Sequence, residues 1–243
     1  MADQAPPDIG SATQCPAMRD VLVSTVLPDD PVAAYFNNRA VLYGGQMWLE
    51  RSAFSAVAEL AEPLAGARVI DLATGTGGVP VALYARRHRM AALVAVDASP
   101  RMMERARERL RRAQPSPRFV QADARKVPLP DATADVVTIG YLLHLVHIDA
   151  QREVLNEAFR LLRPEGRLIA VVHSSPGGLP GHAYRWAWKA VSLVLGLDRL
   201  HYRPMVDLVP VVREAGFLVD ATWRVPGVYW SQVLRARRPA ASR

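Results

Sequence analysis

The chain has 243 residues, half of them hydrophobic, and a formal net charge of +7 at pH 7. This length is typical of one large domain, and so many apolar residues exclude a mainly disordered protein. The single cysteine, Cys15, cannot form an intrachain disulfide, which fits a reducing interior. A basic balance suits nucleic acid, anionic lipid or an acidic substrate, although a generally arginine-rich composition is the simpler explanation.

The first residues carry no basic segment followed by an apolar run, and no apolar stretch reaches the roughly 18 residues of a membrane span. We therefore expect a cytoplasmic protein. Residues 1–30 contain several prolines and scattered acids and are expected to form a flexible leader. Apolar residues at helical spacing then predict a helical N-terminal lid over residues 31–65, with a break at Gly44 and Gly45 and a second helix from about residue 46.

Short apolar strands alternate with helices through the middle of the chain. The strands are predicted at residues 68–72, 92–96, 118–121, 134–139 and 167–173. The helices between them are predicted at residues 79–87, 100–113 and 150–162. Such alternation indicates an α/β fold, a doubly wound and mostly parallel sheet of the Rossmann-like type with helices on both faces.

The last third of the chain has a different pattern. A glycine- and proline-rich loop is predicted at residues 174–181, followed by helices at 182–197 and 206–215. Two further strands, at residues 217–223 and 228–235, would form an antiparallel edge and bring the sheet to seven strands. We expect one domain over residues 66–243, with an insert at about 176–203 before the last two strands.

One glycine-rich segment follows the first strand and opens a helix, namely Val69-Ile-Asp-Leu-Ala-Thr-Gly-Thr-Gly-Gly-Val-Pro80. Gly75 and Gly77 let the backbone turn sharply and approach a ligand closely. Asp71 would repel a pyrophosphate but suits the cationic methionine part of S-adenosylmethionine. Pro80 stands where a nicotinamide-binding motif has its third glycine, so a nicotinamide oxidoreductase is set aside.

Acidic residues also end the next two strands. Asp97 lies twenty residues beyond Gly77, where a carboxylate can bond both hydroxyls of a ribose. Asp123 ends the third strand, where an acid and a neighbouring backbone N–H can read an adenine edge. Met102 could pack on the adenine face or simply fill the core. For the carboxylates the alternative is a helix-capping or solvated acid.

The segment from Val69 to Val171 resembles the class I methyltransferases of the type-11 group, over roughly residues 66–173. Asp131-Ala-Thr-Ala-Asp-Val-Val and Leu162-Arg-Pro-Glu-Gly-Arg-Leu are similar to later motifs of that group. The resemblance implies an S-adenosylmethionine-dependent methyltransferase whose product is S-adenosylhomocysteine. It also implies that Asp71, Gly75 and Gly77 hold the methionine and ribose region, Asp97 the ribose and Asp123 the adenine. The further candidates for the cofactor site are Ala73, Ala98, Met102, Ala124, Gly140 and Tyr141.

A weaker resemblance to the ubiquinone and menaquinone C-methyltransferases lies outside this segment. Residues 35–43, Tyr-Phe-Asn-Asn-Arg-Ala-Val-Leu-Tyr, are similar to that family's opening F-D-x-I-A-x-x-Y-D motif, and residues 215–217 and 226–228 also match in position. The chain departs from the family where Asn37 replaces an aspartate and Gly44 follows the tyrosine. A tryptophan-rich stretch also replaces the family's segment before Gly216.

His144 and His147 follow the fourth strand, in a loop that faces the cofactor in this fold. A neutral histidine there could accept a proton, so both are candidate catalytic residues that act as a base or orient the substrate. The alternative is a hydrogen-bonded or exposed histidine at a helix start. No Cys/His cluster has the spacing of metal ligands, so no metal is expected.

The tryptophan-rich insert and the helix near Tyr35 could together cover the site, which would suit an apolar or aromatic substrate. The insert's mixture of Arg, Lys and Trp also suits an interfacial helix on anionic lipid, and plain packing of the insert on the core is a further alternative. The candidate substrate-binding residues are Tyr35, Tyr43, His144, Trp186 and Tyr229.

Three functions remain open from the sequence. The first is in-line methyl transfer to a lipophilic small molecule, such as a quinone, a polyketide-like compound or another secondary metabolite. The second is phospholipid-headgroup N-methylation, with peripheral membrane contact. The third is nucleic-acid methylation or RNA binding, which the lack of an Asn-Pro-Pro-Tyr motif disfavours, so no nucleic acid is expected. The sequence leaves open the acceptor, the methylated atom, the need for a base and the oligomeric state.

Overall fold

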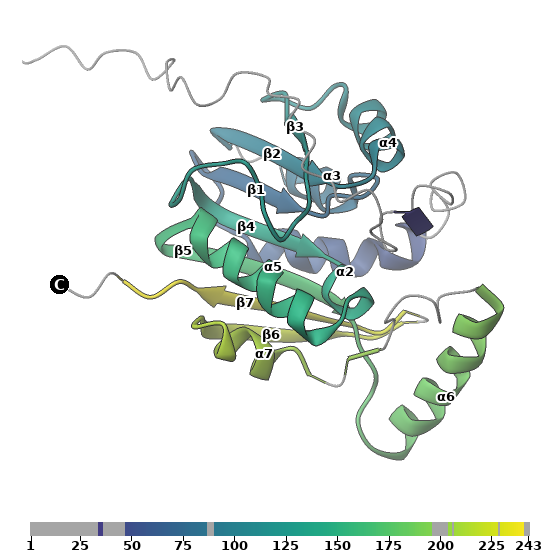
Figure 1. Cartoon of the computed structure of the whole chain (residues 1–243). Coiled ribbons are helices and arrows are strands. Elements are labelled where there is room, and N and C mark those ends of the chain that lie inside the picture. The colour runs from purple at the N-terminus through teal and green to yellow at the C-terminus, as the bar shows by residue number, and fades with distance from the viewer. Residues whose placement is uncertain are drawn as a thin grey trace, which may run out of the picture.

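The computed structural model describes residues 34–35, 47–86, 90–195, 204–205, 207–227 and 229–240. Within these residues, seven strands form one sheet in the order β3-β2-β1-β4-β5-β7-β6 (Figure 1). The strands are β1 (Arg68–Leu72), β2 (Ala92–Asp97), β3 (Arg118–Gln121), β4 (Ala134–Gly140), β5 (Leu162–His173), β6 (Leu218–Val225) and β7 (Ser231–Arg237). The first five strands pair in parallel, and β7 pairs antiparallel with β5 and β6. The predicted doubly wound sheet with an antiparallel edge is confirmed.

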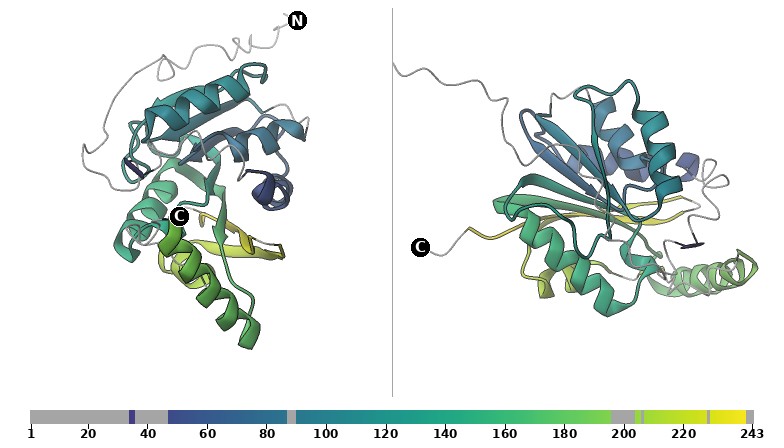
Figure 2. Two further views of the ribbon diagram at one scale, coloured as in Figure 1. Left: turned by 90° about the vertical axis from the view of Figure 1, so that its right-hand side faces the viewer. Right: turned by 45° about the horizontal axis from the view of Figure 1, so that its top comes forward.

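Helices cover both faces of this sheet (Figure 2). On one face α5 contacts β4 and β5, and α7 contacts β6; on the other face α2 contacts β5 and β7, and α3 and α4 continue the layer. The helices are α2 (Met47–Leu60), α3 (Gly78–Ala85), α4 (Pro100–Leu110), α5 (Ile148–Leu161), α6 (Gly178–Leu195) and α7 (Val209–Glu214), with the 3-10 turn η3 (Leu143–Leu145). No helix within the described ranges is both long enough and apolar enough to cross a membrane.

Alternate residues of the central strands fill two apolar cores, one on each face of the sheet. Ile70 and Val137 pack in one core with Leu155 of α5. Their chain neighbours Val69 and Val136 pack in the opposite core, together with residues of α2 and α3. Burial of one such side chain contributes roughly 1.5–3 kcal/mol. Because both faces are covered, these strands appear in the sequence as continuous apolar runs.

The strand order reverses between β1 and β4, since β2 and β3 lie to one side of β1 and β4 and β5 to the other. In open α/β sheets, ligands bind at such a switch point, beyond the carboxyl ends of the strands. Residues 73–77 follow β1 at this carboxyl edge, and residues 98–99 follow β2. The fold therefore brings the predicted cofactor motifs to one edge of the sheet.

Element boundaries differ from the prediction in the last third of the chain. α6 begins at Gly178, inside the expected loop, because Pro180 stands in the first helical turn, where its missing N–H costs nothing. In Figure 1 and in the right view of Figure 2, α6 extends away from the sheet beyond the carboxyl edge. β5 begins at Leu162 instead of residue 167, with a register shift opposite Ala134 and Val136.

Of the predicted first helix, only residues 34–35 are described, and they are helical.

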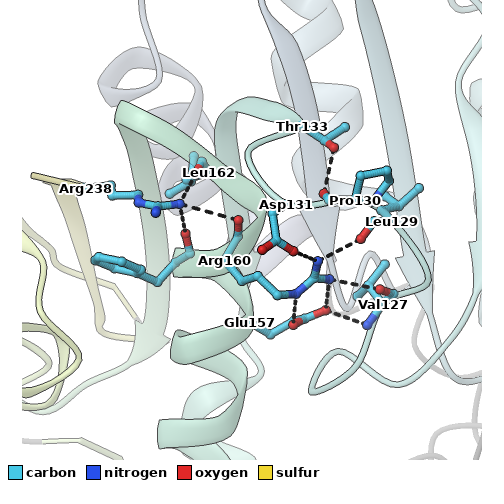
Figure 3. A network of polar contacts seen from close by, with 10 residues as sticks. Val127, Leu129, Pro130, Asp131, Thr133, Glu157, Arg160, Leu162 and Arg238 are labelled. Carbon is cyan, nitrogen blue, oxygen red and sulfur yellow. Dashed lines mark hydrogen bonds and ion pairs between the residues drawn. The ribbon is translucent and has the colours of Figure 1, made fainter. Parts of the chain in front are cut away.

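A network around Arg160 of α5 holds the loop between β3 and β4 (Figure 3). The guanidinium pairs with Glu157 at 2.7 Å and with Asp131 at 2.6 Å. It also donates to the backbone carbonyls of Leu129 at 2.8 Å and Val127 at 3.0 Å. Glu157 in turn accepts from the backbone N–H of Val127 at 2.6 Å. The loop that contains Asp123 is thereby fixed to a helix on the sheet.

Candidate active site at the carboxyl edge of the sheet

Residues 73–77 join β1 to α3 in a tight turn. Gly75 and Gly77 have left-handed φ angles of 54° and 86°, and Ala73 shares this region with a φ of 55°. A Cβ atom at Gly75 would meet nothing within 4 Å, so the space beside this backbone is open. Arg109 of α4 fixes the turn by donating to the backbone carbonyl of Thr76 at 3.1 Å and to its hydroxyl at 2.7 Å. A ligand can thus approach the main chain closely while the turn itself stays in place.

Asp97 ends β2 and connects that strand to the glycine turn. Its Oδ2 accepts from the N–H of Gly75 at 2.7 Å, and its Oδ1 accepts from the N–H of Ser99 at 2.8 Å. Burial raises the pKa of Asp97 to about 6, while the two backbone donors act in the opposite direction. Because a carboxylate has about four lone-pair sites, it keeps acceptor capacity for the hydroxyls of a bound ribose.

Asp71 lies on β1, 1 % exposed, and its Oδ1 accepts from the hydroxyl of Thr138 on β4 at 2.5 Å. Among the described residues, its Oδ2 makes no hydrogen bond of good geometry. Burial raises the pKa of Asp71 to about 7; the hydroxyls of Thr138 and Thr74 oppose this shift, and the Asp97 charge adds to it. A buried carboxylate with an incompletely satisfied oxygen, beside open backbone, fits a cationic hydrogen-bond donor such as the ammonium of S-adenosylmethionine.

The carboxylate of Asp123, after β3, is paired within its own loop. Its Oδ1 accepts from the backbone N–H of Arg125 at 2.8 Å, and the Arg125 guanidinium contacts both oxygens, at 3.0 Å or less. Sequence reasoning missed Arg125. An adenine contact at Asp123 stays a prediction, and it would have to share the carboxylate with this guanidinium.

Met102 is 2 % exposed in α4, and its N–H donates to the Ser99 hydroxyl at 3.2 Å, which caps the helix.

Six rings meet where β4, β5 and β7 reach this edge, and we call them the aromatic cluster: Tyr141, His144, His173, Tyr184, Trp188 and Tyr229. Tyr141 follows Gly140 with a φ of 53°, is 6 % exposed and shares a hydrogen bond with the Ser231 hydroxyl at 2.7 Å. Its ring centre lies 5.5 Å from that of Tyr229 and 5.9 Å from that of His144. The predicted residues Gly140, Tyr141 and His144, at the end of β4 and just after it, thus meet Tyr229, which precedes β7, in one region.

His173, which sequence reasoning missed, is at the centre of the aromatic cluster. It ends β5 with no exposed surface, stacks on Tyr229 with ring centres 4.0 Å apart, and meets Trp188 edge-on at 4.8 Å. Its Nε2 lies 2.7 Å from the hydroxyl oxygen of Tyr184. The Tyr184 hydroxyl oxygen accepts from the backbone N–H of Trp230 at 3.1 Å and also from the Trp188 indole, which leaves its own hydrogen for His173. Burial lowers the pKa of His173 to about 3, which keeps the ring neutral.

The two histidines predicted from the sequence have different surroundings. His144 is 2 % exposed, and burial, assisted by His173, lowers its pKa well below the usual range. His144 Nδ1 accepts a long hydrogen bond of 3.4 Å from the backbone N–H of His173. His147 instead forms the N-terminal cap of α5, exposed and 3.1 Å from the Asp149 carboxylate. For His147 the structure favours the alternative of a surface helix cap, because η3 ends at Leu145 and the chain then turns outward into α5.

The remaining substrate candidates, Trp186, Tyr35 and Tyr43, differ in where the structure places them. Trp186 is 70 % exposed and lies beside Lys189, so the indole that joins the aromatic cluster is Trp188, two residues further along α6. A substrate contact at Trp186 stays a prediction; Trp186 does not join the cluster because residues two apart on a helix point about 200° apart. Tyr35 is helical and partly buried, and Tyr43 lies outside the described residues.

Comparison with known proteins decides the family. Residues 69–166, the segment with the glycine turn and the acidic strand ends, match the methyltransferase domain model. A demethylmenaquinone methyltransferase of Thermus thermophilus is 33% identical over 160 residues, which cover 65% of this chain and 70% of that protein. The chain belongs to the class I S-adenosylmethionine-dependent methyltransferases. A ubiquinone/menaquinone biosynthesis C-methyltransferase of Desulfotalea psychrophila is 38% identical over 120 residues, which is 49% of this methyltransferase and only 46% of that protein.

Solved structures agree on the fold of this methyltransferase. The magnesium protoporphyrin IX methyltransferase of Synechocystis, crystallised with S-adenosylhomocysteine, has a TM-score of 0.66 at 18% identity and covers 85% of this chain and 98% of its own. The 1,6-didemethyltoxoflavin-N1-methyltransferase of Burkholderia thailandensis, with its substrate and S-adenosylhomocysteine, has a TM-score of 0.63 at 24% identity, with coverages of 86% and 89%. The methyltransferase uses S-adenosylmethionine as its cofactor, and the open turn at Gly75 and the oxygens of Asp71 and Asp97 fit that molecule.

Proposed function

We propose that this methyltransferase transfers a methyl group to a flat, lipophilic small molecule of the quinone type or a related secondary metabolite. The aromatic cluster carries this proposal, because stacked and edge-on rings favour planar apolar ligands. The similarity to a demethylmenaquinone methyltransferase and to a ubiquinone/menaquinone C-methyltransferase supports it further. Because the chain spans about half the length of several of these relatives, their substrate remains a proposal for this enzyme.

When bound, S-adenosylmethionine supplies an electrophilic methyl carbon on a sulfonium. Asp97 would accept hydrogen bonds from the ribose hydroxyls, while Asp71 would face the ammonium. The aromatic cluster would hold the acceptor in line and exclude water. Positioning of this kind contributes on the order of 7–11 kcal/mol to lowering a barrier in favourable cases.

His144 and His173 would orient the acceptor and not ionise it, because burial keeps both rings neutral. In His173 the hydrogen bond from Tyr184 occupies Nε2, so the proton of the neutral ring resides on Nδ1. In His144 the backbone N–H of His173 faces Nδ1, which leaves the proton on Nε2. An acceptor that needs deprotonation would therefore lose its proton before binding or to water.

The test uses methyl-labelled S-adenosylmethionine with a panel of acceptors: a short-chain demethylated quinol, phosphatidylethanolamine vesicles and total RNA. Label on the quinol with none on the other two supports the proposal, and an Asp97→Asn variant with much weaker transfer ties the label to this site. Label on phosphatidylethanolamine would favour headgroup N-methylation, a second candidate that the exposed apolar surface of α6 keeps open. Label on RNA alone would refute the small-molecule proposal.

A further inference from the structure

α6 carries large apolar side chains that face solvent. Leu179 and Val194 are each 86 % exposed, Trp186 is 70 % exposed and Leu193 is 60 % exposed. Single exposed apolar residues are ordinary, whereas a contiguous group of this size marks a site of interaction. This group lies on the helix that extends away from the sheet beyond the carboxyl edge (Figures 1 and 2).

Helical periodicity shows that these side chains share one surface. At about 100° per residue, the four lie within a sector of roughly 100°, and we call this sector the outer face of α6. The opposite sector holds Tyr184, Trp188 and the buried Ser192, and it is the sector that contacts the sheet. The helix thus has two apolar sides. The inner side contacts the aromatic cluster, and the outer face is free to contact a partner.

A cationic strip runs between these two sides. Arg185 and Lys189 fall in the same sector of the wheel, and His182 lies beside them. The ammonium of Lys189 is 5.2 Å from the ring centre of Trp186. The sequence of α6, Gly178–Leu195, contains no acidic residue that could neutralise these cations. An anionic partner would supply the missing charge.

We propose that the outer face of α6 docks this enzyme on the surface of an anionic lipid bilayer. An interfacial helix buries a Trp/Leu/Val face at the boundary between head groups and acyl chains, and its lysine and arginine side chains reach the lipid phosphates. The outer face and the adjacent cationic strip have this arrangement. With 18 residues, α6 would lie along the membrane plane over about 27 Å.

A second copy of the chain is the less suitable occupant. In an antiparallel helix pair related by a two-fold axis, Arg185 and Lys189 would come beside their own copies, with no carboxylate on α6 to offset the repulsion. Anionic lipid has the opposite charge along the whole helix. Charge complementarity therefore selects the bilayer.

This docking would place the membrane next to the acceptor site, a consequence that rests on the proposed function. The inner side of the same helix brings Trp188 to 4.8 Å from His173 and to 5.3 Å from Tyr229. An apolar acceptor dissolved in the bilayer would then meet the aromatic cluster without crossing bulk water.

The test measures co-sedimentation of the full chain with vesicles of phosphatidylglycerol and phosphatidylcholine, one to three, and with pure phosphatidylcholine. We expect the anionic vesicles to bind the enzyme, and added salt to weaken the binding. The triple variant Leu179→Gln, Leu193→Gln, Val194→Gln should bind at least about tenfold more weakly, and Lys189→Glu several-fold more weakly. The matched control is Leu218→Gln, which alters a 50 % exposed apolar residue on β6 and should bind like the wild type.

S-adenosylmethionine binding is measured on the same samples, so that the two proposals can fail separately. Retained cofactor binding with no vesicle binding, or equal binding of wild type and triple variant, would overturn the docking proposal alone. Vesicle binding without methyl transfer to any apolar acceptor would overturn the proposed function alone. If light scattering shows that the wild type is a dimer and the triple variant a monomer, and neither binds vesicles, the outer face would be assigned to a second copy of the chain.

Discussion

Replacement of Asp71 by Asn should stabilise the enzyme without cofactor and weaken its binding of S-adenosylmethionine. The pKa of this buried carboxyl rises from 3.8 to about 7 on folding. Since one pKa unit corresponds to about 1.4 kcal/mol, the ionised side chain costs the folded state roughly 4 kcal/mol at pH 8. An asparagine keeps an acceptor for Thr138 and never ionises, so it avoids this cost.

The sign of the pH dependence follows from the raised pKa. The folded state holds the Asp71 proton more tightly than the unfolded chain, so ionisation lowers stability as the pH rises from about 4 through about 7. The gap in unfolding free energy between Asp71→Asn and wild type should therefore widen by about 2 kcal/mol between pH 5.5 and pH 8. His144 and His173 titrate in the opposite sense, but they are present in both proteins and cancel in the difference.

Urea unfolding of both proteins at the two pH values measures this gap. Calorimetric titration should also show that wild type binds S-adenosylmethionine about tenfold more weakly at pH 6 than at pH 8, because the ammonium needs the ionised carboxylate. The variant should lose this tenfold dependence and keep only the roughly twofold change that ionisation of Asp97, with a pKa of about 6, produces. Two results would refute this role of Asp71 as a destabilising buried charge that binds the cofactor. One is a variant that is less stable than wild type at pH 8, and the other is a difference in unfolding free energy that does not change with pH.

Three further substitutions test other parts of the site. Asp97→Asn should raise the Kd for S-adenosylmethionine at least about tenfold in calorimetry, since hydrogen bonds to charged groups contribute about 1.5–3 kcal/mol; an unchanged Kd would mean that the ribose binds elsewhere. Tyr184→Phe should raise the KM for the acceptor with the cofactor Kd unchanged, because it cuts the link from α6 to His173; loss of cofactor binding would contradict this role. Arg160→Met should lower the unfolding free energy by about 3 kcal/mol in urea, against about 0–1 kcal/mol for the two exposed pairs removed by Arg152→Met; equal losses would disprove the importance of the network.

The sequence predicted the sheet and the cofactor edge because both depend on local patterns. Apolar runs marked each strand, and the register then brought Asp71, Gly75 and Asp97 to neighbouring strand ends. The predicted lid over residues 31–65 and the cytoplasmic location stay predictions. The boundaries of α6 were missed because glycine and proline near residue 178 read as loop, although proline is well tolerated in a first helical turn.

The acceptor side was harder to predict because it depends on contacts between distant segments. His173 ends a parallel strand, and the rule that singled out Asp97 at the end of β2 would have found it. The choice between Trp186 and Trp188 needed the rotation of α6 relative to the sheet, which no local pattern fixes. The pairing of Asp123 with Arg125 likewise depends on side-chain geometry within a loop.

Arg160 holds the loop before β4 mainly through main-chain atoms, since it donates to the carbonyls of Val127 and Leu129. Every amino acid offers such a carbonyl, so these two hydrogen bonds do not depend on the side chains of the loop, and only Asp131 contributes through its carboxylate. In a saturation mutagenesis library, the exposed loop positions Pro128 and Pro130 should accept many substitutions, while position 160 should accept almost none. Natural variation could thus reshape this loop's outer surface without moving its path.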